Sequence, residues 1–163
     1  MVSAVLGLDE IWQALDEVMD PEIPVVSMVE MGIVRAVEIV DSTVVVSITP
    51  TFAGCPALDA MRSAIYERLR ALGVERVEVK MVLTPPWSSD WITDSARAKL
   101  KQFGLAPPPV HGGNVTLFFP QEVACPYCGS NNTRMTNSFG PTLCRAIYVC
   151  RSCQQPFEQF KAL

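Results

Sequence analysis

Two pairs of closely spaced cysteines near the end of the chain constrain its fold more than any other feature. Cys125 and Cys128 form one pair, Cys150 and Cys153 the other, each with two residues between the thiols. A CxxC turn presents two sulfurs to one metal ion, and two such turns complete a tetrahedral site. The segments TRMTNSF and LCRAIYV between the pairs predict a hairpin that would hold the two turns together. The pattern is typical of a zinc ribbon.

We expect these four cysteines to hold zinc as a structural ion. Zinc has no redox chemistry, and four protein sulfurs leave no open coordination position for a substrate. All-cysteine ligation also suits iron, so the alternatives are a rubredoxin-like mononuclear iron site, an iron–sulfur cluster or disulfides. Cys144 is an extra thiol between the pairs. We interpret it as a small buried hydrophobic residue, with a ligand or sulfur-relay role as the alternative.

The composition excludes several classes of protein. With 49% hydrophobic and 18% charged residues, the chain is not of the disordered type. No apolar run approaches the roughly 18 residues that a membrane helix needs, and the first residues lack the pattern of a signal peptide. We therefore expect a cytoplasmic protein without a membrane partner, where paired cysteines favour metal over disulfides. A net charge of −4 argues against nucleic-acid binding by bulk electrostatics.

Helical and strand patterns alternate along the first two thirds of the chain. Apolar residues at helical spacing predict helices over residues 8–20, 56–72 and 94–103. Alternating apolar residues predict strands over 33–40, 43–49 and 74–83, the first two joined by a tight turn at Asp41-Ser42. In the last of these strands, Met81 and Leu83 are expected to point inwards. The order α-β-β-α-β(-α) indicates an α+β domain with a small three-stranded sheet.

A proline- and glycine-rich stretch marks the expected boundary. We predict an α+β domain over residues 1–104, a linker over 105–113 and a ribbon domain over 114–163. Residues 1–113 carry nine basic and fifteen acidic side chains, whereas residues 114–163 carry four and two. Four thiolates on a divalent ion would neutralise this small basic excess, so the C-terminal part does not have the charge of a nucleic-acid-binding surface.

Cys55 stands apart from the other cysteines, in the sequence Gly54-Cys55-Pro56 before the helix predicted over 56–72. Proline suits the first helical position, which would make Cys55 the N-cap residue, where unpaired N–H groups favour a thiolate. A structural cysteine is the alternative. Asp20 and Glu22 belong to the rigid turn DPEIP, whose simplest interpretation is a helix stop. A functional role for them requires proximity to Cys55.

These segments resemble two known families. Four short segments of this chain resemble the SufT-like domain found in iron–sulfur assembly and targeting factors. They are DPEIP (20–24), MGI (31–33), TPT (49–51) and GCP (54–56). The C-terminal CPYCGS and FGPTLCRAIYVCRSCQQPFEQFK resemble the ribbon of the PaaD-type proteins of the phenylacetyl-CoA epoxidase system. The resemblance implies that Cys55 is a reactive cysteine that transfers iron or a cluster, with Asp20, Glu22 and Thr51 as its neighbours.

The same resemblance implies an accessory protein of the multicomponent phenylacetyl-CoA epoxidase in a bacterial cytoplasm, which assists assembly of iron or iron–sulfur centres in the oxygenase or the reductase. One histidine cannot supply the two Glu-x-x-His motifs of a di-iron oxygenase, and no flavin or nicotinamide motif is present, so we expect no catalysis. Cys55 would hold iron transiently with a second thiol, from a client or from a second chain in a homodimer. The alternatives are a structural or regulatory subunit, a rubredoxin-like electron-transfer module and a nucleic-acid-binding ribbon.

Overall fold

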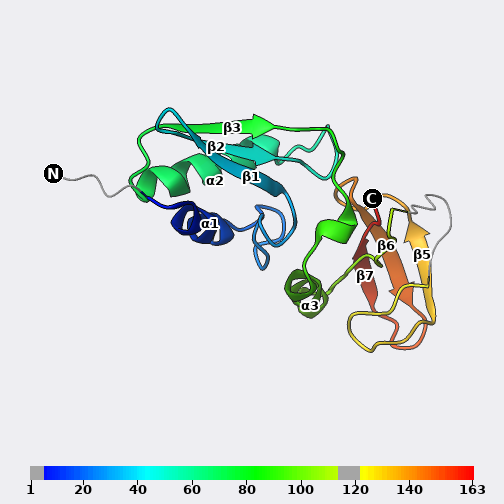
Figure 1. Ribbon diagram of the computed structural model, residues 1–163. Helices are drawn as coiled ribbons and strands as arrows, with labels where there is room; N and C mark the ends of the chain where they lie inside the picture. The colour runs from blue at the N-terminus through cyan, green and yellow to red at the C-terminus, as the bar shows by residue number, and fades with distance from the viewer. Residues whose placement is uncertain (1–5, 114–121) are drawn as a thin grey trace. The chain divides into compact units, whose positions relative to one another are not determined.

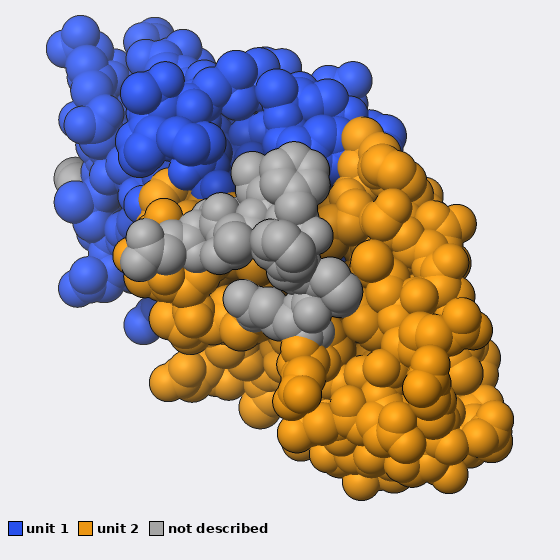
Figure 2. All heavy atoms as spheres, turned by 90° about the vertical axis from the view of Figure 1, so that its right-hand side faces the viewer, with its two compact units in different colours: residues 1–87 blue, residues 88–163 orange. Residues whose placement is uncertain are grey.

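The computed structural model describes residues 6–113 and 122–163, and the chain forms two compact units (Figure 1). Figure 2 shows unit 1, residues 1–87, in blue and unit 2, residues 88–163, in orange. Within the described ranges no helix is both long enough and apolar enough to cross a membrane. The chain is of the α+β class, as predicted.

Unit 1 combines two helices with a three-stranded sheet. Its helices and strands are α1 (Leu8–Asp16), β1 (Val34–Val40), β2 (Thr43–Ile48), α2 (Leu58–Ala71) and β3 (Val77–Met81). The strand order is β1-β2-β3, with β2 antiparallel to β1 and parallel to β3. Helix α1 packs on α2 and β1, α2 also packs on β3, and both helices lie on the same side of the sheet (Figure 1).

The central strand β2 supplies much of the core of unit 1. Val44, Val46 and Ile48 alternate along it and are buried, as the period of a strand predicts. Asp41 and Ser42 both have positive φ angles, 47° and 63°, so they form the tight turn expected between β1 and β2.

Two sequence expectations for unit 1 are wrong in detail. Met81 and Leu83, expected to point inwards, are 45% and 46% exposed, because β3 is an edge strand and Leu83 lies beyond its end. Helix α1 ends at Asp16, not at residue 20. The chain leaves the helix early because Val18 and Asp20 form backbone hydrogen bonds with residues further along the chain. Met28 N donates to Val18 O, and Asp20 N donates to Val26 O.

Unit 2 contains the ribbon. Its elements are the 3-10 helix η1 (Ser89–Trp91), α3 (Asp94–Phe103), β4 (Leu105–Ala106), β5 (Thr133–Asn137), β6 (Arg145–Cys150) and β7 (Pro156–Phe160). The sheet order is β4-β7-β6-β5, with β6 antiparallel to both neighbours and β4 parallel to β7. The β5–β6 hairpin and the bounds of α3 agree with the sequence prediction, whereas β4 and β7 were not predicted.

The two compact units are divided before the start of the predicted linker. The division falls between Trp87 and Ser88, so α3 lies in unit 2. The predicted linker over 105–113 begins with β4, whose residues Leu105 and Ala106 are buried and pair with Glu158 and Gln159 of β7. Gly104 caps the C-terminus of α3 in a left-handed conformation, and the chain then passes directly into β4.

A polar cluster fixes the rest of this segment to η1. The Asp90 carboxylate accepts hydrogen bonds from the backbone N–H groups of His111 and Gly112, both at 2.8 Å. Gly113 N donates to His111 Nδ1 at 3.1 Å, and His111 Nε2 lies 3.1 Å from the carbonyl oxygen of Leu163. The ring of His111 is thus held between Gly113 and Leu163, and its Nδ1 lies 3.5 Å from the Asp90 carboxylate.

Replacement of Asp90 by Ala should destabilise the protein at neutral pH and leave its stability in acid unchanged. The backbone N–H of His111, aided by that of Gly112, holds the pKa of Asp90 below its usual value of 3.8. A carboxyl group with a lowered pKa stabilises the fold above its unfolded pKa and loses this contribution as the pH falls through the folded value. Thermal unfolding of both proteins at pH 7 and about pH 2.5 measures this. An equal difference in Tm at both pH values would contradict it.

Candidate metal centre

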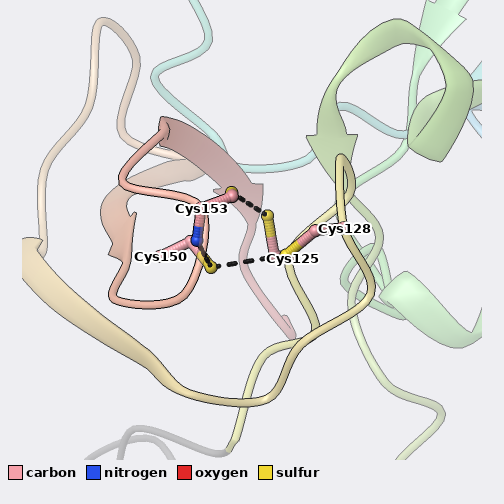
Figure 3. A group of neighbouring side chains, drawn as sticks. All are labelled: Cys125, Cys128, Cys150 and Cys153. Carbon is pink, nitrogen blue, oxygen red and sulfur yellow. Dashed lines mark hydrogen bonds between the residues drawn. The ribbon is translucent and has the colours of Figure 1, made fainter.

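Two tight turns carry the paired cysteines (Figure 3). Cys125 and Cys128 lie in the turn before β5, where Gly129 N donates to Cys125 O and Cys125 N to Ser130 O, both at 2.9 Å. Gly129 has a φ of 75°, a conformation that favours glycine. Cys150 ends β6 and Cys153 lies in the turn to β7, which is closed by a bond from Cys150 N to Gln155 O. Both turns thus have a fixed backbone.

The turns bring the four sulfurs together with the spacing of a metal site. All four lie within 4.8 Å of one another. Cys125 Sγ is 3.7 Å from Cys153 Sγ, and Cys128 Sγ is 3.6 Å from Cys150 Sγ. Zinc–sulfur bonds of about 2.3 Å in a tetrahedron separate the sulfurs by about 3.8 Å, whereas a disulfide bond is about 2.05 Å long. The donor set therefore fits a tetrahedral ion, and no two cysteines of the described ranges form a disulfide.

The electrostatics of the group also favour a cation. The backbone N–H of Cys153, with that of Ser152, lowers the pKa of Cys150 to about 6. The N–H of Gln155 favours the Cys153 thiolate, but burial and the neighbouring sulfurs together raise the pKa of Cys153 to about 12. One thiol of the group thus ionises readily while its neighbour resists a second negative charge. A divalent ion would remove this conflict.

Two serines, which the sequence analysis did not single out, connect the two turns. Ser130 Oγ and Ser152 Oγ are 2.8 Å apart. The backbone N–H of Ser130 bonds to the sulfur of Cys128, and that of Ser152 to the sulfur of Cys150. The available signal was their position, since each serine follows a cysteine of the group by two residues.

Cys144 lies outside the four-sulfur group. It is buried, its Sγ is 3.1 Å from Thr142 Oγ1, and its carbonyl oxygen accepts a hydrogen bond from Lys161 N. Its burial agrees with the interpretation as a small hydrophobic residue.

Cys55 lies in the segment between β2 and α2 and is only 9% exposed, although Gly54 and Pro56 on either side are exposed. The prediction that it caps α2 is wrong, because the helix begins at Leu58 and its N-cap residue is Ala57. Proline at position 56 first forms a turn, with a bond from Leu58 N to Cys55 O at 3.3 Å, and the helix starts only after it.

Asp20 has a structural role in unit 1. It is 5% exposed, and its Oδ1 accepts hydrogen bonds from the backbone N–H groups of Glu22, at 2.8 Å, and Ile23, at 3.0 Å. The carboxylate thus closes the DPEIP turn on itself. Glu22 is partly exposed, as is Thr51.

The loop that contains Asp20 and the segment that contains Cys55 meet at the same end of the sheet (Figure 1). The loop runs into β1 through Ile33, and Thr49, just after β2, donates its N–H to the Ile33 carbonyl at 2.8 Å. The fold therefore gathers the predicted segments at one edge of unit 1. Proximity between the side chains of Cys55, Asp20, Glu22 and Thr51 stays a prediction.

Substitution of Cys150 by Ser should release the metal and loosen the ribbon. Cys150 is 0% exposed and ends β6, so its loss removes a ligand from the interior of unit 2. Elemental analysis should show near-complete loss of metal, and limited proteolysis should show faster cleavage within residues 122–163. Cys144→Ser is the matched control, because Cys144 is buried outside the group. A metal-free C150S protein that resists protease as the wild type does would disprove the metal-dependent fold.

Two family models match this chain. The model described as iron-sulfur cluster assembly protein matches residues 8–81, which include all five elements of unit 1. The model described as PaaD zinc beta ribbon domain matches residues 112–161, which include the four-cysteine group. Residues 82–111 lie between them, and their assignment to a domain stays a prediction.

Relatives extend the match over most of the chain. A protein of Escherichia coli (strain K12), provisionally named as a component of 1,2-phenylacetyl-CoA epoxidase, is 41% identical over 154 residues, 94% of this chain and 92% of that protein. Two shorter relatives are similar over 94 residues, 56% of this chain. The Fe-S protein maturation auxiliary factor of Porphyromonas gingivalis is 30% identical with 89% of its length covered. The auxiliary factor YitW of Bacillus subtilis is 32% identical with 91% covered.

Solved structures show the same fold for the N-terminal part. A DUF59 domain of unknown function from Bacillus anthracis has a TM-score of 0.52 and 29% identity, with 56% of this chain and 89% of that chain covered. A conserved hypothetical protein from Thermotoga maritima has a TM-score of 0.50 and 29% identity, with 61% and 95% covered.

Fold, site and matches together define a protein in which an iron–sulfur assembly domain precedes a four-cysteine zinc ribbon. The chain belongs to the PaaD family, as the resemblance of its segments implied.

Proposed function

We propose that this chain is a non-catalytic maturation factor that assists assembly of an iron or iron–sulfur centre in a phenylacetyl-CoA epoxidase. The observation that carries the proposal is the joining of two parts in one chain. Relatives that share only the first part are named Fe-S protein maturation auxiliary factors, and the relative that shares both is provisionally named as an epoxidase component. The clients would be the oxygenase or the iron–sulfur reductase, in a bacterial cytoplasm.

The ribbon would serve as the anchoring part. Cys125, Cys128, Cys150 and Cys153 supply the sulfur spacing of a four-thiolate zinc site. Zinc, when bound, links the two turns and stabilises the sheet around them. The ribbon would then offer a firm surface to another subunit.

Cys55 would be the transfer residue, since a thiolate is a soft ligand that exchanges iron readily. Cys55 is only 9% exposed, so release or capture of iron would require movement of the residues around it. A second ligand would come from the client or from a second copy of this chain.

A second candidate function is that of a structural subunit without metal transfer. The burial of Cys55 favours this alternative, as does the use of the Asp20 carboxylate by its own turn. The two candidates differ in one outcome, the iron content of the epoxidase.

Cys55→Ala should leave the protein folded and lower the iron content of co-expressed epoxidase severalfold. The substitution removes one sulfur from the segment before α2 without disturbing a secondary-structure element. Cys144→Ala, which removes a buried sulfur from unit 2, is the control and should leave the iron content unchanged. Elemental analysis of the purified epoxidase measures the result. Full iron content with the C55A protein would reject transfer through Cys55 and support the structural subunit.

A further inference from the structure

We propose that metal enters and leaves the ribbon through Cys128, which exchanges with a thiolate ligand arriving from solvent. The inference rests on the metal occupancy proposed above and adds which of the four ligands opens first. A four-cysteine site could release its ion in two ways, by unfolding of the whole ribbon or by opening at one ligand. The structure favours the second, because the four cysteines are held very differently.

Burial separates Cys128 from the other three. Cys125 and Cys150 are 0% exposed and belong to the same apolar cluster as Tyr148 and Phe157, whose rings stack at 5.6 Å. Cys153 is partly buried and packs against that cluster. Cys128 is exposed and lies outside it. Displacement of Cys128 would therefore leave the core intact, whereas displacement of any of the others would disturb it.

The backbone contacts also distinguish Cys128 from the buried cysteines. Cys150 is the last residue of β6, where it pairs with Thr133 of β5, and its sulfur accepts the N–H of Cys153 at 3.5 Å. Cys128 is in a turn outside the strands of the sheet, with the exposed Tyr127 and Gly129 beside it. A Cβ placed on Gly129, the residue after Cys128, would meet no atom within 4 Å, so the chain is not crowded at this point of the turn.

The exchange step balances without an oxidant or reductant. An incoming thiol loses its proton as its sulfur binds the metal, the bond from the metal to Cys128 breaks, and the Cys128 sulfur takes up a proton. The charge of the site and its number of sulfur ligands stay the same. Cys125, Cys150 and Cys153 hold the ion during this first exchange, and complete transfer to a thiol-rich acceptor requires the same exchange at each of these three sulfurs.

The first test is the order of thiol modification in the metal-loaded full chain. Wild-type protein is analysed for metal, treated with iodoacetamide, and mapped by mass spectrometry over time. Cys128 should be modified first, about tenfold or more faster than Cys125 and Cys150. A common rate for all four cysteines would show opening by unfolding and would overturn the proposal. Absence of metal from the wild type would reject the ribbon assignment itself.

The second test compares metal release from two variants. C128S should fold and retain metal on three sulfurs, but lose it to a coloured chelator about tenfold or more faster than the wild type. C125S, which removes a core ligand, should be purified without metal. Equal metal loss from both variants would overturn the special role of Cys128. None of these outcomes depends on Cys55, so failure here is distinguishable from failure of the transfer function.

Discussion

The ribbon depends on four sulfurs held so close together that they cannot all carry a negative charge without a cation. The turns fix sulfur pairs at 3.6 and 3.7 Å, and the opposite pKa shifts of Cys150 and Cys153 show how the group resists a second charge. The surrounding core is small and consists mainly of Tyr148, Phe157 and a few short side chains. Binding energy for a metal is therefore folding energy for this part of the chain.

The fold of unit 1 depends instead on the burial of apolar side chains. Its candidate functional residues, Asp20 and Cys55, lie in two loops at one end of its sheet. The Thr49–Ile33 hydrogen bond joins those loops, and the Asp20 carboxylate closes the turn in one of them. The acidic residue that looked functional in the sequence thus holds the backbone. Cys55, in the other loop, is only 9% exposed.

Sequence reasoning predicted what depends on local pattern and missed what depends on tertiary context. The β1–β2 turn, α3 and the grouping of the four cysteines follow from turn chemistry, helical period and ligand spacing. Strand β4 was missed because two residues are too few to show an alternating pattern. Strand β7 was missed because it begins with Pro156 and contains polar residues among its apolar ones. The N-cap role of Cys55 failed because Pro56 is compatible with both a first helical turn and the tighter turn found here.

Strand β4 has a practical consequence for anyone who dissects this protein. It lies at the margin of the ribbon sheet, upstream of the segment matched by the ribbon family model, and covers one side of β7. A fragment cut at residue 112 would carry every cysteine of the metal group yet leave β7 with an uncovered flank. An edge strand with unpaired backbone groups can pair with strands from other molecules. Fragments that begin at Ser88 should therefore stay monodisperse under conditions in which fragments that begin at residue 112 aggregate.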